Sequence, residues 1–427
     1  MREDWNRRAR EDMHYYVAFG RRNQNEEEFF ATSREVVYGL EYELKRLPKN
    51  AGRTGWRALE IGCGPARLMK PLSVHFGEIH GVDVSDEMVR RARENLRGIP
   101  HAYAHRTSGA ELGQFGAESF DFVYSYAVFQ HIPSRAVVLS YLSEARRVLK
   151  TGGLLWFQVN GLPEEASAAD TWSGVRFRAK EIREFADSHD FQMYALEGLG
   201  TQYMWTSLRK RPAGWYRELP ESAAASQARI RRISNPHGTE PVVPCRGRFA
   251  VASLWMENLP GECGLNHLRV RIGEAYGLPN YIAAPLADGQ QQINVLLPDG
   301  VATGLVPVEV EWLGRPLTPE AIMRSVPPGP LVPRLLSVTD ATDLLSGTRI
   351  VSGSVKVTME ELARPEEVVI LIDGELAGPL LVHCAEPRAP RWELVVPLGE
   401  RVDPGRHQME IRIGRRRLPA VEIEVAP

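Results

Sequence analysis

Two glycines and one carboxylate form the part of the sequence with the clearest chemical pattern. Gly62 and Gly64 follow a mainly apolar strand that ends at Ile61, and Asp83 comes nineteen residues after Gly64. Glycine lets the backbone turn sharply without a Cβ, so a ligand can lie against bare peptide. The two acceptor oxygens of Asp83 can take both hydroxyls of a ribose. The pattern predicts a nucleotide-binding βαβ unit, with a purely structural glycine turn as the alternative.

Two further residues bear on which nucleotide would bind. Arg67 stands where the dinucleotide fingerprint G-x-G-x-x-G has its third glycine, and Glu60 lies two residues before the first glycine. A carboxylate at that place would repel a pyrophosphate, whereas it could face a cationic or amino-bearing ligand. NAD is therefore the weaker candidate.

An alternation of strands and helices would position these residues. The expected strands are 57–61, 79–84, 120–126, 154–159, 191–196 and 202–208. The expected helices are 66–76, 85–96, 134–149 and 180–189. This order predicts an α/β doubly wound, Rossmann-like domain, in which a parallel sheet carries helices on both faces and its last strand is antiparallel.

At these motifs the sequence resembles the class I S-adenosylmethionine-dependent methyltransferases, whose first motif reads acid, any residue, Gly, any residue, Gly. Ser85–Met88 resembles the family's cap after the ribose acid, and Ser108–Leu112 resembles its adenine-side loop. Ser119–Ile132 resembles the fourth strand and the turn after it, and Ala145–Leu155 resembles the helix and glycine pair before the fifth strand. The likeness covers residues 1 to about 212 and does not specify the substrate.

The resemblance implies S-adenosyl-L-methionine as the cofactor and a set of residues that bind it. These candidates are Glu60, Gly62, Gly64, Arg67, Asp83, Val84, Met88, Ser108, Gly109, Ser125 and Tyr126. Ser108 departs from the acidic or amide residue often found there, and Ala66 departs from a common glycine, so donor binding could be weakened. No N-P-P-Y-type signature follows the fourth strand, which disfavours methylation of a nucleobase nitrogen.

Methyl transfer from a sulfonium depends mainly on aligning the nucleophile and excluding water, and a base is optional. His131 is the candidate catalytic base, because the turn after the fourth strand opens next to the sulfonium in the family that the sequence resembles, and an imidazole titrates near neutral pH. The alternative is that His131 only caps the turn before Ile132 and Pro133. Candidate substrate-binding residues are Tyr15, Tyr16, Phe129, Trp172 and Arg176. Core packing and an ordinary surface loop are the alternatives for these residues.

The length of 427 residues predicts two or three compact domains. Residues 1–212 would form the methyltransferase domain, with a helical lid at 1–50 that closes over the site or, alternatively, docks on the sheet for stability. A linker at 213–240 would lead to β-sandwich domains at 241–330 and 335–427, where residues alternate as in Val306–Trp312. The first sandwich resembles immunoglobulin-like domains in Gln292–Pro298, and a shared pattern suggests that the second is built alike.

The amino-acid composition limits the kinds of partner that the protein is expected to bind. The 52 basic and 54 acidic residues give no general reason to bind nucleic acid or an anionic membrane. The charged N-terminus and the lack of a long apolar run predict a cytoplasmic protein. The four cysteines form no C-x-x-C pair, which predicts free thiols and no metal.

The leading hypothesis is an enzyme that methylates an oxygen or nitrogen of a small-molecule or saccharide acceptor, with a homodimer formed through the sandwiches as a further expectation. One alternative is a non-catalytic binding or scaffold protein with a degenerate methyltransferase fold. A nicotinamide oxidoreductase is a third hypothesis, which Arg67 and Glu60 disfavour.

Overall fold

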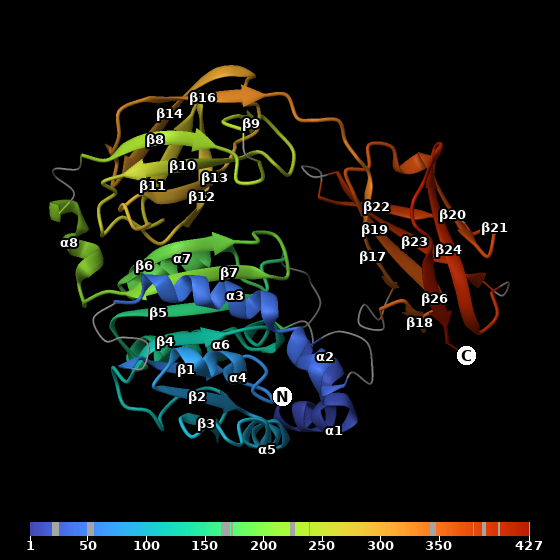
Figure 1. Cartoon of the computed structure of the whole chain (residues 1–427), viewed down its shortest axis with the longest axis horizontal. Helices are drawn as coiled ribbons and strands as arrows, with labels where there is room; N and C mark the ends of the chain where they lie inside the picture. The colour runs from blue at the N-terminus through green and yellow to red at the C-terminus, as the bar shows by residue number, and fades with distance from the viewer. Residues whose placement is uncertain are drawn as a thin grey trace. The chain divides into compact units, whose positions relative to one another are not determined.

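The computed structural model describes residues 1–18, 25–48, 55–163, 171, 174–222, 227–238, 240–341, 347–378, 380–386, 390–399 and 402–426. They form two compact units, which are described separately (Figure 1). The first unit comprises Met1–Val17, Asn25–Val243 and Val251–Ser325, and the second is formed mainly by Val326–Pro427.

The α/β part of the first unit follows the predicted alternation closely. Its strands are β1 (Arg57–Ile61), β2 (Glu78–Asp83), β3 (Ala102–Arg106), β4 (Phe120–Ser125), β5 (Leu149–Val159), β6 (Phe191–Glu197) and β7 (Met204–Lys210). Its helices are α4 (Met69–Leu72), η4 (Ser73–His75), α5 (Asp86–Asn95), η5 (Phe129–His131), α6 (Arg135–Val148) and α7 (Ala179–Ser188). Ser85 and Ser134 cap α5 and α6 with their side chains, as their residue types suggest.

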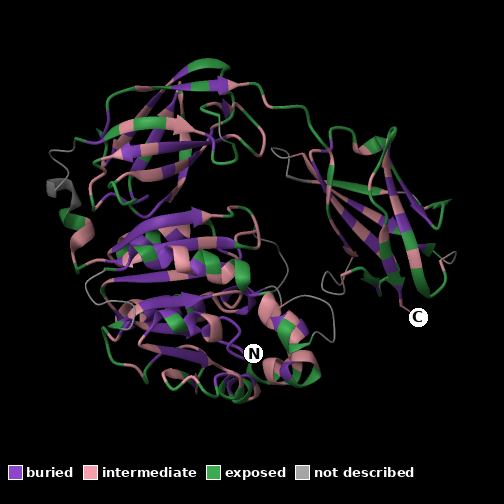
Figure 2. Ribbon diagram, viewed as in Figure 1, coloured by how far each residue is buried: buried purple, intermediate pink, exposed green. Residues whose placement is uncertain are grey.

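The strands lie in the order β3-β2-β1-β4-β5-β7-β6. The neighbours from β3 to β5 are parallel, whereas β7 runs antiparallel to both β5 and β6. The chain order reverses between β1 and β4, and in such sheets ligands bind beside the carboxyl ends of the strands at this switch point. The predicted Rossmann-like fold is therefore confirmed, and Figure 2 shows that its central strands are largely buried.

Two local predictions were wrong. The helix expected at 66–76 begins only at Met69, because Ala66 adopts a left-handed φ of 66° that a right-handed helix cannot contain. Strand β3 was not predicted, because its sequence Ala-Tyr-Ala-His-Arg has no apolar run, and it is half exposed at the sheet edge.

The N-terminal segment is helical, as expected, but it is broken into several pieces: α1 (Arg2–Ala18), α2 (Glu26–Ala31), α3 (Arg34–Glu43) and η1 (Leu44–Arg46). The α1 backbone departs from helical angles at Asp12. Asn25 and Glu28 form a reciprocal capping box that starts α2. Within the described part of the chain, no helix is both long and apolar enough to cross a membrane.

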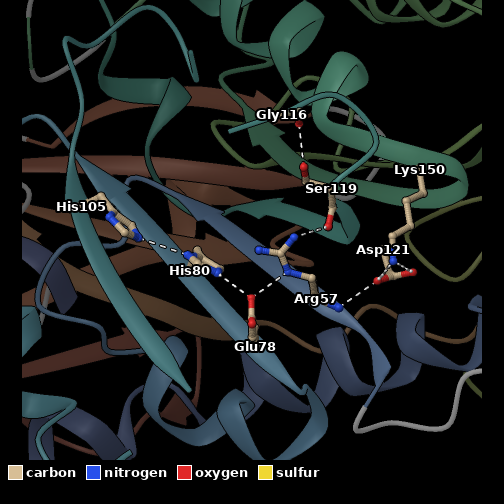
Figure 3. Close-up of polar contacts among 8 residues, drawn as sticks. All are labelled: Arg57, Glu78, His80, His105, Gly116, Ser119, Asp121 and Lys150. Atoms are coloured by element: carbon tan, nitrogen blue, oxygen red, sulfur yellow. Dashed lines mark hydrogen bonds and ion pairs between the residues drawn. The ribbon is translucent and has the colours of Figure 1, made fainter. Parts of the chain in front are cut away.

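A polar network ties the strands together near their amino ends, opposite to the carboxyl edge (Figure 3). Arg57 Nε of β1 lies 2.8 Å from Glu78 Oε2 of β2. The Arg57 backbone N–H donates to Asp121 Oδ2 of β4 over 2.8 Å, and Lys150 Nζ of β5 lies 2.8 Å from the same oxygen. The carboxyl ends of the same strands remain available for a ligand.

Two histidines extend this network toward the sheet edge (Figure 3). His80 Nδ1 lies 3.1 Å from His105 Nε2, and His80 Nε2 lies 3.3 Å from Glu78 Oε2. The rings of Phe115 and Phe120 meet the His80 ring edge to face, each at 5.5 Å. Burial lowers the pKa of both histidines, so the neutral imidazoles are favoured.

The remainder of the first unit is mostly β-structure. It contains α8 (Trp215–Ser222) and strands β8 (Arg229–Ser234), β9 (Val243–Pro244), β10 (Val251–Glu257), β11 (Leu268–Ile272), β12 (Ala275–Ile282), β13 (Gln291–Leu296), β14 (Gly304–Trp312), β15 (Arg315–Pro316) and β16 (Ala321–Val326). The predicted alternation in β14 is confirmed, because Val306, Val308, Val310 and Trp312 are all buried.

This β-structure is joined to the α/β sheet. Strand β12 pairs with β6 at Tyr281 and Ala195. At the end of α3, Arg46 Nε of η1 lies 2.8 Å from Glu43 Oε2, and both side chains are buried. Arg46 also donates to the carbonyl oxygen of Ile282 over 2.6 Å. The hydroxyl of Ser207 in β7 also donates to Glu43, so the buried ion pair links the α/β sheet to the β-structure that follows it.

The second unit is formed by two sheets. Its strands are β17 (Arg334–Asp340), β18 (Arg349–Ile350), β19 (Ser354–Glu360), β20 (Val368–Ile372), β21 (Glu375–Leu376), β22 (Leu381–Glu386), β23 (Arg391–Pro397), β24 (Gly405–Ile413), β25 (Arg416–Arg417) and β26 (Val421–Val425), with η6 at Pro365–Glu367. One sheet has the order β17-β19-β23-β22 and the other β18-β26-β24-β20-β21. Val357 and Leu394 of the first sheet share a buried core with Ile411 and Ile423 of the second. An all-β C-terminal region is thus confirmed.

Candidate functional site

The glycine turn after β1 packs against β2 and against the loop after β4. Gly62 and Gly64 both have positive φ angles, of 75° and 51°. The N–H groups of Gly62 and Cys63 donate to the carbonyl oxygen of Val82 over 2.8 and 3.0 Å. A Cβ on Gly62 would collide with the Val128 side chain. The turn therefore requires glycine at position 62, and a ligand lying against its bare peptide stays a prediction.

Asp83 is anchored by this turn. Its Oδ2 accepts the N–H of Gly64 over 3.0 Å, and its Oδ1 accepts the N–H of Ser85 over 2.8 Å. Each carboxylate oxygen has a second lone pair, so both can still accept a ribose hydroxyl. Burial raises the pKa of Asp83 to about 6, while the two backbone N–H groups oppose that rise. The carboxylate is therefore held rigidly, and it is ionised above about pH 6.

Glu60 lies beneath the turn, and its carboxyl group is buried. The hydroxyl of Tyr124 donates to Glu60 Oε2 over 3.0 Å. Burial raises the pKa of Glu60 to about 8, and the charge of Asp83 acts in the same direction. The nearby charge of Arg67 opposes the rise. A ligand cation at this place would favour the ionised carboxylate, because opposite charges stabilise each other.

Arg67 connects the turn to α2. It is buried, it donates to Thr32 Oγ1 over 3.1 Å, and its guanidinium carbon lies 5.3 Å from the centre of the Tyr126 ring. Burial lowers the pKa of Arg67, whereas Tyr126 and Glu60 oppose this shift. The structure thus brings together Glu60 and Arg67 of the glycine motif with Tyr126, which follows the fourth strand.

The adenine-side candidates gather beside β2. Gly109 has a φ of 105°, and a Cβ on it would lie 3.1 Å from the side chain of Val84. Met88 is buried, and its N–H donates to Ser85 Oγ over 3.1 Å. Ser108 is exposed, and its hydroxyl donates to Glu111 Oε1 over 3.4 Å. Val84 and Gly109 can flank a flat base, and Ser108 precedes Gly109 at the surface.

Helix α1 covers the edge of this site, and two of its contacts were not predicted. Asn6 Oδ1 accepts from Ser85 Oγ over 2.7 Å and from the Glu87 N–H over 3.2 Å. The Val17 side chain lies 3.8 Å from the place where a Cβ on Gly64 would stand. No local sequence pattern indicates these contacts, because they join residues about eighty and fifty positions apart in the chain.

The candidate base lies under the same helix. His131 is 2% exposed, and the Trp5 ring of α1 meets it edge to face at 5.5 Å. Gln130 Nε2 lies 3.2 Å from His131 Nε2, which therefore accepts in the tautomer with its proton on Nδ1. The side-chain amide of Gln158 also donates to Gln130. Proton transfer to His131 would require this contact to open, and the catalytic role stays a prediction.

Two other candidates, one at the end of β4 and one in the turn after it, have buried side chains. The Phe129 ring is fully buried, 6.0 Å from the rings of Tyr141 and Phe157. The Ser125 hydroxyl donates to the carbonyl oxygen of Ile61 over 2.9 Å. The side chains fit the core alternative, so a role in binding would come from the backbone or from the shape of the site.

The remaining candidates for substrate binding come from α1 and from the part of the chain after β5. Tyr15 is buried, and its N–H donates to Asp12 Oδ1 over 3.0 Å at the α1 kink. The Tyr16 hydroxyl donates to Glu11 over 3.0 Å. Arg176 donates to the carbonyl oxygen of Pro163. Trp172 lies outside the described residues.

Metal ligation has no support among these residues. Within the ranges that the structure describes, no three His, Cys, Asp or Glu side chains are arranged to hold a metal ion. The four cysteines are free thiols, and burial raises the pKa of Cys63 in the glycine turn.

Comparison with known proteins agrees with the strand order and the motifs. Residues 59–157 match the family model of a methyltransferase domain. The chain is 34% identical over 110 residues to a ubiquinone biosynthesis O-methyltransferase of Ruegeria sp. (strain TM1040), covering 25% of this chain and 42% of that relative. It is 30% identical over 140 residues to phosphoethanolamine N-methyltransferase 2 of Caenorhabditis elegans, covering 32% of this chain and 31% of the relative. The chain thus spans less than half the length of these relatives.

Solved structures of methyltransferases show weaker similarity. One is magnesium protoporphyrin IX methyltransferase of Synechocystis PCC 6803 with bound S-adenosylmethionine, at 16% identity and a TM-score of 0.36, covering 49% of this chain and 94% of that one. Another is a methyltransferase of Aquifex aeolicus, at 16% identity and a TM-score of 0.30, covering 41% of this chain and 96% of that one. Residues 59–157 carry a methyltransferase domain, and S-adenosyl-L-methionine is its cofactor.

Proposed function

We propose that this protein transfers the methyl group of S-adenosylmethionine to an oxygen or nitrogen of a small molecule. The observation that carries the proposal is the anchored carboxylate of Asp83, whose two oxygens each keep a lone pair beside a bare glycine turn. The relatives named as O- and N-methyltransferases support these two acceptor atoms.

When bound, the donor would supply an activated methyl group: the acceptor's lone pair forms the new bond to the methyl carbon, and the electron pair of the broken sulfur–carbon bond stays on sulfur in S-adenosylhomocysteine. The protein's own contribution is alignment and exclusion of water. Asp83 would fix the ribose, Val84 and Gly109 would flank the base, and Glu60 would face the donor's charged groups. Helix α1 would shield the site, since Val17 already lies over Gly64. If the acceptor is a hydroxyl, His131 is the proposed base.

The folds and roles of the two β-regions are also proposals. We propose immunoglobulin-like folds for the two β-regions, with roles in binding a partner, the substrate or a second copy of the chain. Their sheets and buried inward-facing residues support this proposal. A saccharide acceptor, a cytoplasmic location and the domain boundaries predicted above also stay proposals.

The test is donor consumption. Purified protein is incubated with S-adenosylmethionine and a panel of hydroxyl and amine acceptors, and release of S-adenosylhomocysteine is measured. Acceptor-dependent release, absent in Asp83→Ala, is the expected result. Tight donor binding with no release for any acceptor would instead favour the non-catalytic scaffold.

A further inference from the structure

Four aromatic side chains form a cluster around Trp205 at the carboxyl edge of the sheet. Trp205 is at the centre, with ring centres 4.9 Å from Trp156, 5.6 Å from Tyr126 and 6.3 Å from Tyr203. The planes of these three pairs are within 25° of parallel. We call Tyr126, Trp156, Tyr203 and Trp205 the aromatic shelf.

The strand register puts the shelf on one face of the sheet. Trp156 of β5 stands beside Tyr124 of β4, which stands beside Glu60 of β1. Trp205 of β7 stands beside Gln158, two residues after Trp156. Neighbouring residues in paired strands point to the same face, so the shelf shares the face that carries Glu60.

The shelf also adjoins the donor-binding candidates directly. Arg67, three residues after Gly64, lies with its guanidinium carbon 5.3 Å from the centre of the Tyr126 ring. The side chain of Gln158 fixes the ends of the shelf: its Oε1 accepts the Ala127 N–H over 3.1 Å, and its Nε2 donates to the Gln202 carbonyl oxygen over 3.0 Å. The loops that carry Tyr126 and Tyr203 are therefore held together next to the glycine turn.

The shelf is not an ordinary core cluster. None of its four residues is buried, and Tyr203 is 39% exposed. By contrast, Phe129, Phe157 and Phe122 of the same sheet region are completely buried. Contiguous apolar surface that stays open beside a binding site usually serves recognition.

The arrangement of the rings selects a ligand chemistry. Rings in nearly parallel planes extend naturally by one more flat ring through offset stacking. A quaternary ammonium group prefers rings that surround it, and the shelf does not form such a cage. The guanidinium of Arg67 at the Tyr126 end can donate a hydrogen bond to an oxygen on such a flat ring.

We propose that the methyl acceptor is a flat, hydroxyl-bearing aromatic ring that stacks on the aromatic shelf, with Trp205 and Tyr203 as its contacts. This inference rests on the proposed function, because it names the acceptor class of the same site. Trp205 and Tyr203 are binding residues in this account, and they take no part in donor binding.

The experiment uses the full-length protein saturated with S-adenosylhomocysteine. Catechol is titrated calorimetrically, and cyclohexane-1,2-diol, which has the same two hydroxyls without the aromatic ring, is the matched ligand control. The variants are Trp205→Leu and Tyr203→Leu, and Trp255→Leu is the control because Trp255 is a partly exposed tryptophan of β10. Tyr203→Leu changes an exposed loop residue and is the variant least expected to disturb folding.

Catechol is expected to bind at least about tenfold more tightly than the diol, and each shelf variant to lose roughly this preference. The affinity for S-adenosylhomocysteine should stay within about twofold in all variants, and Trp255→Leu should match the parent protein. Equal binding of the two diols, or an unchanged catechol affinity in both shelf variants, would overturn the shelf proposal while donor binding stands. Preferential binding of choline would also overturn it. A protein that fails to bind S-adenosylhomocysteine would refute the proposed function itself.

Discussion

The replacement Asp83→Ala tests the donor site at its best-defined residue. In the parent protein the carboxylate accepts N–H groups from Gly64 and Ser85 over 3.0 and 2.8 Å, and its remaining lone pairs are those assigned to the ribose. Losing two ribose hydrogen bonds to a charged group costs roughly 1.5–3 kcal/mol, which is about a ten- to hundredfold loss of affinity.

The variant also loses the acceptor for two backbone N–H groups, so a fall of about 1–3 kcal/mol in unfolding free energy is expected alongside the weaker binding. Calorimetric titration with S-adenosylhomocysteine measures the first effect, and urea denaturation measures the second. Asp86→Ala is the matched control, because Asp86 is exposed at the start of α5 and pairs with Arg2.

The pH dependence gives a second measure of the same residue. Since burial raises the pKa of Asp83 to about 6, the ionised acceptor is lost as the pH falls through that value. Donor affinity should therefore decline between pH 7 and pH 5 in the parent, and this component of the decline should vanish in Asp83→Ala. An unchanged affinity at pH 7 in a folded Asp83→Ala protein would refute the assignment of the ribose to this carboxylate.

Three further predictions concern other parts of the first unit. Arg46→Met removes the positive charge that pairs with the buried carboxylate of Glu43, so the unfolding free energy measured by urea denaturation should fall by about 3–5 kcal/mol. A fall below about 1 kcal/mol would contradict a stabilising role for this ion pair. His131→Ala should keep its affinity for S-adenosylhomocysteine and lose roughly a hundredfold in turnover, and a rate equal to the parent's at high pH would argue against a base. Burial lowers the pKa of His80 and His105 below 6.5, so the unfolded chain binds more protons than the folded chain at low pH, and the unfolding free energy should fall as the pH decreases from 7 to 5. In His80→Gln this fall should be smaller when urea denaturation is measured at both pH values. An unchanged fall would contradict the prediction.

The sequence predicted the α/β fold because its signals are local. Strands β1, β4 and β5 each contain several apolar residues within a short stretch of sequence, and Ser85 caps the helix that follows it directly. The same locality explains the errors. Strand β3 is an edge strand with polar residues, and the left-handed Ala66 that delays α4 has no signature in its residue type.

In the candidate site, too, the sequence indicates residues that are close in the chain and misses contacts between residues that are far apart in it. Gly62, Gly64 and Asp83 were found from their spacing, because the βαβ unit fixes their geometry within about twenty residues. The hydrogen bond from Tyr124 to Glu60 and the contact of Asn6 with Ser85 join residues 64 and 79 positions apart, so only the folded chain reveals them.

The aromatic shelf was missed for a related reason. Tyr126 was recognised on its own, but Trp156 and Trp205 read as ordinary alternating strand residues. Their proximity depends on the antiparallel register of β5 and β7. Phe129 was singled out because it follows the same strand, and burial shows that its side chain belongs to the core.

The central claim is that the glycine turn and Asp83 form a site for S-adenosylmethionine. The most direct test is calorimetric titration of the purified protein with S-adenosylmethionine and S-adenosylhomocysteine, with NADH as the control ligand. Micromolar or tighter binding of both sulfur nucleosides, and no heat from NADH, is the expected result. No binding of either nucleoside by the folded protein would contradict the claim and would favour a degenerate fold whose function lies in the β-regions.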